Sequence, residues 1–125
     1  MKILESAENY LETILILKQR NGYVRSIDIA NELNFSKPSV SNAMKSFREN
    51  KLITMDASGL IEFTPKGEAI AKDVYEKHVL LGKFLMLIGV EEEIAKADAC
   101  RIEHVISDET FDRIKEHIGK LKGAE

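Results

Sequence analysis

The spacing of apolar residues changes twice along this 125-residue chain, and the order of those changes limits the folds open to it. Residues 4–19, 27–33 and 37–50 repeat apolar residues every three or four positions, which predicts three helices. Residues 52–55 and 60–63 have a period of two around a turn that ends in Gly59, which predicts a β-hairpin. Helical spacing returns over about 65–88 and 91–106, and a last helix follows Ser107. The chain is therefore expected to be mainly α-helical.

Short polar residues mark where the predicted helices begin. Ser26, Ser36 and Ser107 each precede a helical segment, and we expect their side-chain oxygens to cap it. Thr64 and Pro65 are expected to be the cap and first residue of the helix over 65–88, because a proline there loses no hydrogen bond. The boundaries favour a short second helix joined to the third by a tight turn.

The order helix, short helix, tight turn, helix and hairpin over residues 4–64 is that of a winged helix-turn-helix. The helix over 37–50 would enter the major groove, with short polar residues near its start and basic residues on phosphates. A three-helix core with a hairpin and no DNA is the alternative. The candidate DNA-binding residues are Ser36, Lys37, Pro38, Ser39, Ser41, Asn42, Lys45 and Arg48.

The net charge of −3 conceals a basic segment. Positions 36–51 carry four lysines and arginines against Glu49 alone, and a local basic stripe matters more to a phosphate backbone than the total. A solvated helix face is the alternative explanation. The hairpin tip at 56–59 contains no lysine or arginine, so we expect the hairpin to contribute little to phosphate binding.

A second group of residues has the chemistry of metal ligands. Cys100, Glu103 and His104 are spaced to share one helix face, and thiolate, carboxylate and imidazole are common ligands of transition metals. His78 interrupts the apolar stripe of the helix over 65–88. The alternatives are a small buried cysteine, a core histidine and a solvated glutamate. The candidate ligands are Glu12, His78, Cys100, Glu103, His104 and Asn9.

Several protein classes are excluded by what the sequence lacks. Neither a metalloprotease motif, a glycine-rich phosphate loop nor a Ser-His-Asp set occurs, so we expect no enzyme; Cys100 with His104 as its base is the enzymatic alternative. Its lone cysteine fits a reducing cytoplasm, and no apolar run is long enough to cross a membrane. We expect a cytoplasmic protein with no membrane partner.

The sequence resembles a known protein family over nearly its whole length. The resembling segments are 6–14, 28–30, 38–41, 60–67, 77–81 and 100–109. The most specific reads Cys100-Arg101-Ile102-Glu103-His104-Val105-Ile106-Ser107-Asp108-Glu109. Together they resemble the diphtheria toxin repressor family, which includes iron-dependent regulators and manganese transport regulators.

The resemblance implies a homodimeric transcriptional repressor that binds palindromic operator DNA when loaded with Fe²⁺ or Mn²⁺ and controls metal homeostasis genes. Zn²⁺, Co²⁺ or Ni²⁺ are possible substitutes. It implies a winged helix-turn-helix domain over 1–64 and an all-helical dimerisation and metal-binding domain over 65–125. The six candidate ligands match ligand positions of the family. A winged-helix regulator without metal control, whose Cys100 cluster is structural or redox-sensing, is the alternative.

The chain also departs from parts of the family pattern. Cys100 is the residue of iron-type members, whereas Glu12 matches the manganese type. Asn9 stands where those types place Asp or Met. Gly82 and Lys96 occupy positions where ligands of an ancillary site would be expected, so we expect one main site per protomer. From a sequence of 125 residues we expect the two-domain form of the manganese type, without the SH3-like domain of iron-type members.

Overall fold

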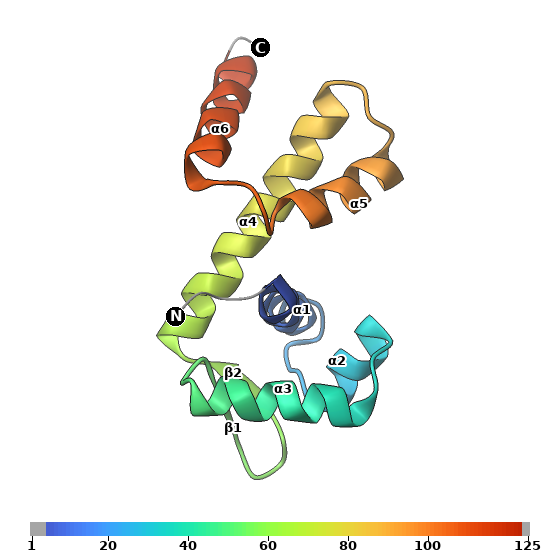
Figure 1. Ribbon diagram of the computed structural model, residues 1–125, viewed down its shortest axis with the longest axis vertical. Helices are drawn as coiled ribbons and strands as arrows, with labels where there is room; N and C mark the ends of the chain where they lie inside the picture. The colour runs from blue at the N-terminus through green and yellow to red at the C-terminus, as the bar shows by residue number, and fades with distance from the viewer. Residues whose placement is uncertain (1–4, 124–125) are drawn as a thin grey trace. The chain divides into compact units, whose positions relative to one another are not determined.

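A computed structural model describes residues 5–123, which form six α-helices and one two-stranded antiparallel sheet (Figure 1). This confirms the expected fold class, a winged helix-turn-helix followed by an all-helical segment. The elements in order are α1 (Glu5–Asn21), α2 (Ser26–Leu33), α3 (Lys37–Glu49), β1 (Ile53–Met55), β2 (Ile61–Phe63), α4 (Pro65–Leu87), α5 (Glu92–Ile102) and α6 (Asp108–Gly123). Leu4, the first residue of the helix predicted over 4–19, lies outside the described residues.

The chain divides into two compact units, Met1–Asp73 (unit 1) and Val74–Glu125 (unit 2). The division falls within α4, whereas the sequence-based domain division stands between Thr64 and Pro65. Among the described residues, no helix is both long and apolar enough to cross a membrane.

Unit 1 is built on the apolar faces of its three short helices and the hairpin. In it α1 packs against α2, α2 against α3, and α3 against β1 (Figure 1). The apolar residues whose spacing predicted the helices lie in the core, because they form the one face of each helix that is removed from water. The fully buried side chains of this core include Leu11, Ile14, Val24, Ile29, Val40, Met44, Leu52, Ile53 and Ile61.

Local capping fixes the start of α3. Ser36 Oγ accepts a hydrogen bond from the backbone N–H of Ser39 at 3.3 Å, and Pro38 stands in the first turn, as predicted. Asn34 adopts a left-handed conformation (φ 57°) that ends α2 and keeps the connection tight. The prediction that Ser26 caps α2 is wrong. Ser26 is the first helical residue, and the cap is Arg25, whose N–H donates to Asp28 Oδ2 at 2.9 Å.

The hairpin has the register Ile53↔Phe63, Thr54↔Glu62 and Met55↔Ile61. Ile53 and Ile61 point into the core, so the alternation buries one residue of each strand firmly. After the hairpin, Thr64 Oγ1 accepts from the N–H of Gly67 at 3.1 Å, which confirms Thr64 as the cap of α4.

Unit 2 surrounds a core of Leu81, Ala99 and Phe111, with Ile102 and Ile114 among the partly buried residues packed on it. Ser107 Oγ accepts from the N–H of Thr110 at 3.1 Å and caps α6, as predicted. The helix predicted over about 91–106 starts within one residue of the prediction but ends earlier than predicted. It begins at Glu92 and ends at Ile102, so Glu103 and His104 follow it in a turn.

Candidate metal and DNA-binding sites

The candidate ligands Cys100, Glu103 and His104 lie close together at the end of α5. Cys100 lies in the last turn of α5, and Glu103 and His104 follow immediately, with hydrogen bonds from Glu103 N to Ala99 O and from Ile106 N to Ile102 O. These bonds keep the turn nearly helical. One ligand atom from each of Cys100, Glu103 and His104 therefore lies within 4.8 Å of the others.

Glu103 is the centre of this cluster. Its side chain is fully buried, and Oε2 lies 2.8 Å from Nδ1 of His78 on α4. Its other oxygen, Oε1, lies 3.3 Å from Nε2 of His104, whose side chain is 3% exposed. Within residues 5–123 this oxygen makes no hydrogen bond. His78 is 27% exposed, which leaves the cluster a side open to solvent.

This arrangement fits a metal ion. Burying a carboxylate away from water costs free energy unless a positive charge or hydrogen bonds compensate it. Among the described residues, Oε1 of Glu103 has no such hydrogen bond. Metal–ligand bonds of about 2.0–2.3 Å place two donors of one ion at most about 4.6 Å apart. The three donor atoms lie within 4.8 Å of one another, so small side-chain shifts would bring them around one ion. A thiol, a carboxylate and an imidazole form a mixed donor set for a divalent transition metal, and the imidazole of His78 contacts the other oxygen of the same carboxylate.

Asn9 and Glu12 belong to unit 1. They are three residues apart on α1 and so lie near one face of the helix, with Glu12 buried and Asn9 partly buried. The backbone carbonyl of Asn9 accepts a hydrogen bond from Thr13 Oγ1 at 2.9 Å. Unit 2 thus assembles four of the six candidate ligands, and unit 1 holds the other two.

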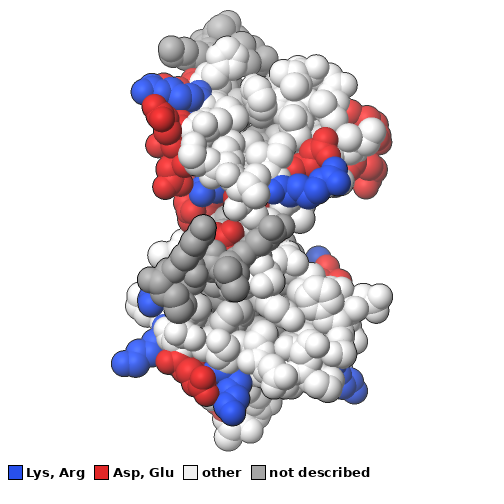
Figure 2. All heavy atoms as spheres, viewed as in Figure 1, with Lys and Arg blue, Asp and Glu red and all other residues white. Residues whose placement is uncertain are grey.

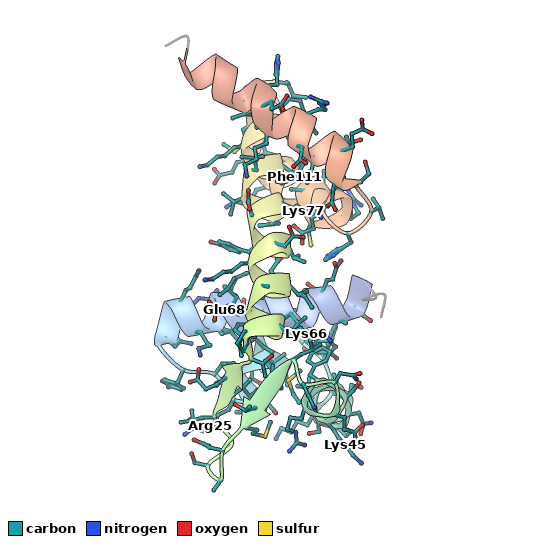
Figure 3. The ribbon with its side chains drawn as sticks, turned by 90° about the vertical axis from the view of Figure 1, so that its left-hand side faces the viewer. Arg25, Lys45, Lys66, Glu68, Lys77 and Phe111 are labelled. Carbon is teal, nitrogen blue, oxygen red and sulfur yellow. The ribbon has the colours of Figure 1, made fainter. Side chains whose placement is uncertain are left out.

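All eight candidate DNA-binding residues are exposed along α3 and its cap. Val40, Met44 and Phe47 hold the opposite face of the helix in the core. At the start of α3, Ser26, Ile27, Lys37 and Ser41 line a hollow of about 310 Å³. Arg25 and Lys45 are labelled in Figure 3 at the end of unit 1 where the hairpin lies. In unit 2, Figure 2 shows acidic side chains along the edges of the visible face, with some basic ones beside them and neither charge at its centre.

Sequence reasoning missed a basic residue at the hairpin. The tip contains no lysine or arginine, but Nε of Arg25 donates to the carbonyl of Ser58 at 3.2 Å. No local pattern could have shown this, because the two residues lie 33 positions apart.

Comparison with known proteins supports the same two-part organisation. Residues 2–69 match the family model described as iron dependent repressor, N-terminal DNA binding domain. Residues 64–124 match the one described as iron dependent repressor, metal binding and dimerisation domain. The chain therefore belongs to the iron dependent repressor family, a class of metal-dependent transcriptional regulators and not of enzymes.

Individual relatives agree with this family. The transcriptional regulator MntR of Escherichia coli O6:H1 is 34% identical over 111 residues, which cover 89% of this chain and 72% of MntR. The uncharacterised HTH-type transcriptional regulator MJ0568 of Methanocaldococcus jannaschii is 32% identical over 94% of this chain and 96% of its own length. The solved structure of the manganese regulator SloR matches with a TM-score of 0.78 and 28% identity over 95% of this chain. The chain spans 55% of the length of SloR.

Proposed function

We propose that this metal-dependent regulator represses genes of metal homeostasis by binding a palindromic operator as a homodimer when it is loaded with Fe²⁺ or Mn²⁺. One α3 helix reads only half of a site, so two-fold symmetry of the protein would be matched by a palindrome in the DNA. We therefore propose that the protein works in the cytoplasm, where it has access to operator DNA. The family's dimerisation domain, matched over residues 64–124, supports this arrangement.

The observation that carries the proposal is the cluster around Glu103. Its carboxylate contacts both His78 and His104, and one ligand atom from each of Cys100, Glu103 and His104 lies within 4.8 Å of the others. We propose that Cys100, Glu103, His104 and His78 hold the ion. From the sequence resemblance, we propose Glu12 as a further ligand, with Asn9 offering a neutral oxygen. A bound divalent ion would supply the positive charge that the buried carboxylate needs.

The chemistry of the donor atoms limits which metal ion we propose. Thiolate favours softer ions such as Fe²⁺, Co²⁺ or Zn²⁺, whereas carboxylate and amide oxygens suit Mn²⁺ and Fe²⁺. Fe²⁺ is compatible with both kinds of donor, and Mn²⁺ ranks next. SloR is named as a manganese regulator, which supports keeping Mn²⁺ beside Fe²⁺ in the proposal.

We propose that α3 enters the major groove with its exposed residues toward the DNA. Ser36, Pro38, Ser39, Ser41 and Asn42 would face bases and nearby phosphates, and Lys37, Lys45 and Arg48 would bind phosphates. The exposure of all eight side chains opposite a buried apolar face supports this role.

A binding assay with the full chain tests the proposal. Operator sequences are first selected from a random duplex pool by the Mn²⁺-loaded protein, and affinity is then measured with and without a chelator. We expect binding to weaken on metal removal and light scattering to give the mass of a dimer. Unchanged affinity in chelator would favour a winged-helix regulator without metal control, and a monomeric mass would contradict the dimer.

A further inference from the structure

Arg25 ties the segment before α2 to the tip of the hairpin. Its Nε donates to Ser58 O at 3.2 Å, and the carbonyl of the preceding residue, Val24, accepts from the N–H of Ile61 at 2.9 Å. The side chain of Val24 is fully buried. Two hydrogen bonds and a buried side chain therefore fix Arg25 against the hairpin.

The hairpin tip itself is poorly suited to bind phosphate. The N–H groups of Ser58 and Leu60 both donate to Oδ1 of Asp56 at 2.9 Å, and that of Gly59 donates to the carbonyl of Asp56 at 3.0 Å. These donors are thus used within the turn. The hydrogen bond from Leu60 N–H and the one from the Ser58 side chain hold the pKa of Asp56 below its ordinary value, so the tip carries a negative charge at neutral pH.

The positive charge of Arg25 also lowers the pKa of Asp56, so the guanidinium acts on the charge at the tip. Its Cζ lies 5.6 Å from the centre of the Tyr23 ring, so the ring and the bond to Ser58 both restrict its position. Among residues 5–123, neither Nη nitrogen of Arg25 makes a hydrogen bond. A guanidinium held at Nε still offers its Nη groups to a phosphate, as bidentate donors.

Arg25 also lies beside the surface that α3 presents. The next residue, Ser26, lines the hollow at the start of α3 together with Lys37 and Ser41. Figure 3 shows Arg25 beside the hairpin at the same end of unit 1 as Lys45. A duplex along the exposed face of α3 that also reached the hairpin would therefore pass near Arg25.

We propose that Arg25 is the phosphate-binding cation of the hairpin, supplied from outside the hairpin and held in place by the carbonyl of Ser58. The inference rests on the proposed DNA-binding function. It replaces a hairpin that contributes little to phosphate binding with one that contacts DNA through a residue 33 positions away in sequence.

A salt series on three proteins tests this role. Mn²⁺-loaded wild type, Arg25→Gln and Arg20→Gln are titrated onto a fluorescein-labelled mixed-sequence duplex, and affinity is followed by anisotropy. Arg20 is the matched control, because it is exposed and its guanidinium is already paired with Glu32 at 2.9 Å. We expect Arg25→Gln to bind about tenfold more weakly at low salt. Its log–log salt slope should be shallower by about 0.9 for each phosphate that the side chain no longer neutralises.

The outcomes distinguish a failure of the Arg25 proposal from a failure of the proposed DNA-binding function. If Arg25→Gln matches wild type, or if Arg20→Gln is weakened as much, Arg25 does not bind phosphate although the protein binds DNA. If wild type does not bind the duplex at any salt concentration, the proposed function fails and this inference fails with it.

A second variant tests the same geometry without touching Arg25. Asp56→Asn keeps the Oδ1 acceptor and so the turn, but removes the negative charge beside the guanidinium. If the tip lies against phosphate, its affinity for the duplex should rise about threefold at low salt. An unchanged affinity of this variant would contradict a hairpin that contacts DNA, whatever the folding of Arg25→Gln.

Discussion

Nδ1 of His78 lies 2.8 Å from Oε2 of Glu103, so an imidazole of α4 and a carboxylate at the end of α5 are in direct contact. Because Glu103 is fully buried, neighbouring groups rather than water must stabilise its carboxylate. Replacing it with an uncharged residue of the same shape separates the electrostatic role of the carboxylate from its packing.

Glu103→Gln is expected to bind Mn²⁺ or Fe²⁺ at least tenfold to a hundredfold more weakly, because it loses a charged oxygen ligand. Anaerobic titration calorimetry on purified protein measures the effect. Glu93→Gln is the control, since Glu93 lies exposed in the first turn of α5 and outside the cluster. Equal metal affinity of the two variants would remove Glu103 from the proposed ligands.

Cys100→Glu is expected to shift metal preference toward Mn²⁺ and away from Zn²⁺, because a hard oxygen replaces a soft sulfur. Competition between the two ions, followed by metal analysis of the bound fraction, measures the shift. Val105→Glu adds the same charge at a side chain that is 76% exposed and should leave the ratio unchanged. A ratio that does not respond to Cys100→Glu would place the thiol outside the metal's ligand set.

Gly67→Ala is expected to destabilise unit 1 by about 1–3 kcal/mol through overpacking. A Cβ at this position would lie 1.9 Å from the backbone oxygen of Leu52, so α4 or the residue before β1 would have to move. Gly82→Ala in the same helix meets nothing within 4 Å and should be stabilising by up to about 1 kcal/mol. Thermal unfolding of the two variants measures the contrast, and equal midpoints would contradict the close approach of Gly67 to Leu52.

Much of the fold could be predicted because its signals are local. Ser36, Thr64 and Ser107 cap helices where the sequence placed caps, since each bond joins residues three positions apart. The cap of α2 was missed because its bond runs in the reverse direction, from the backbone of Arg25 to the side chain of Asp28.

Other features depend on interactions that the sequence does not show. The end of α5 at Ile102 has no glycine or proline to mark it, and the turn that follows continues helical hydrogen bonds. Phe111, which lies in the core of unit 2, did have a local signal, because it precedes Ile114 and Ile118 at helical spacing. The hydrogen bond of Arg25 to Ser58 had no such signal.

Lys45→Ala is expected to make the salt dependence of operator binding shallower by about 0.9 log units per tenfold change in salt for each phosphate that the lysine neutralises in wild type. Lys45 is exposed on α3, on the face proposed to meet DNA. Lys72→Ala is the matched control, because Lys72 is also exposed but pairs with Glu68 at 2.6 Å on α4. The same slope for both variants would contradict the proposed orientation of α3.

Metal and operator are expected to tighten each other's binding by one common factor. If the metal stabilises the DNA-binding state only by its greater affinity for that state, the coupling is expected to be about 1–3 kcal/mol, or roughly 5- to 150-fold. Linkage then requires selected operator DNA to raise Mn²⁺ affinity as much as Mn²⁺ raises operator affinity. Two titrations, each with and without the other ligand, measure the two factors, and unequal factors would contradict a simple linkage.

Glu12→Ala tests which residue carries this coupling, because Glu12 belongs to the DNA-binding unit whereas His78, Cys100, Glu103 and His104 belong to unit 2. We expect a folded dimer that retains some metal binding through the cluster of unit 2 but binds operator weakly at saturating metal. Glu8→Ala, one turn earlier on α1, controls for the loss of a carboxylate from that helix. If Glu12→Ala responds to metal as fully as wild type does, Glu12 does not couple the ion to DNA, and the switch must operate through the other proposed ligands.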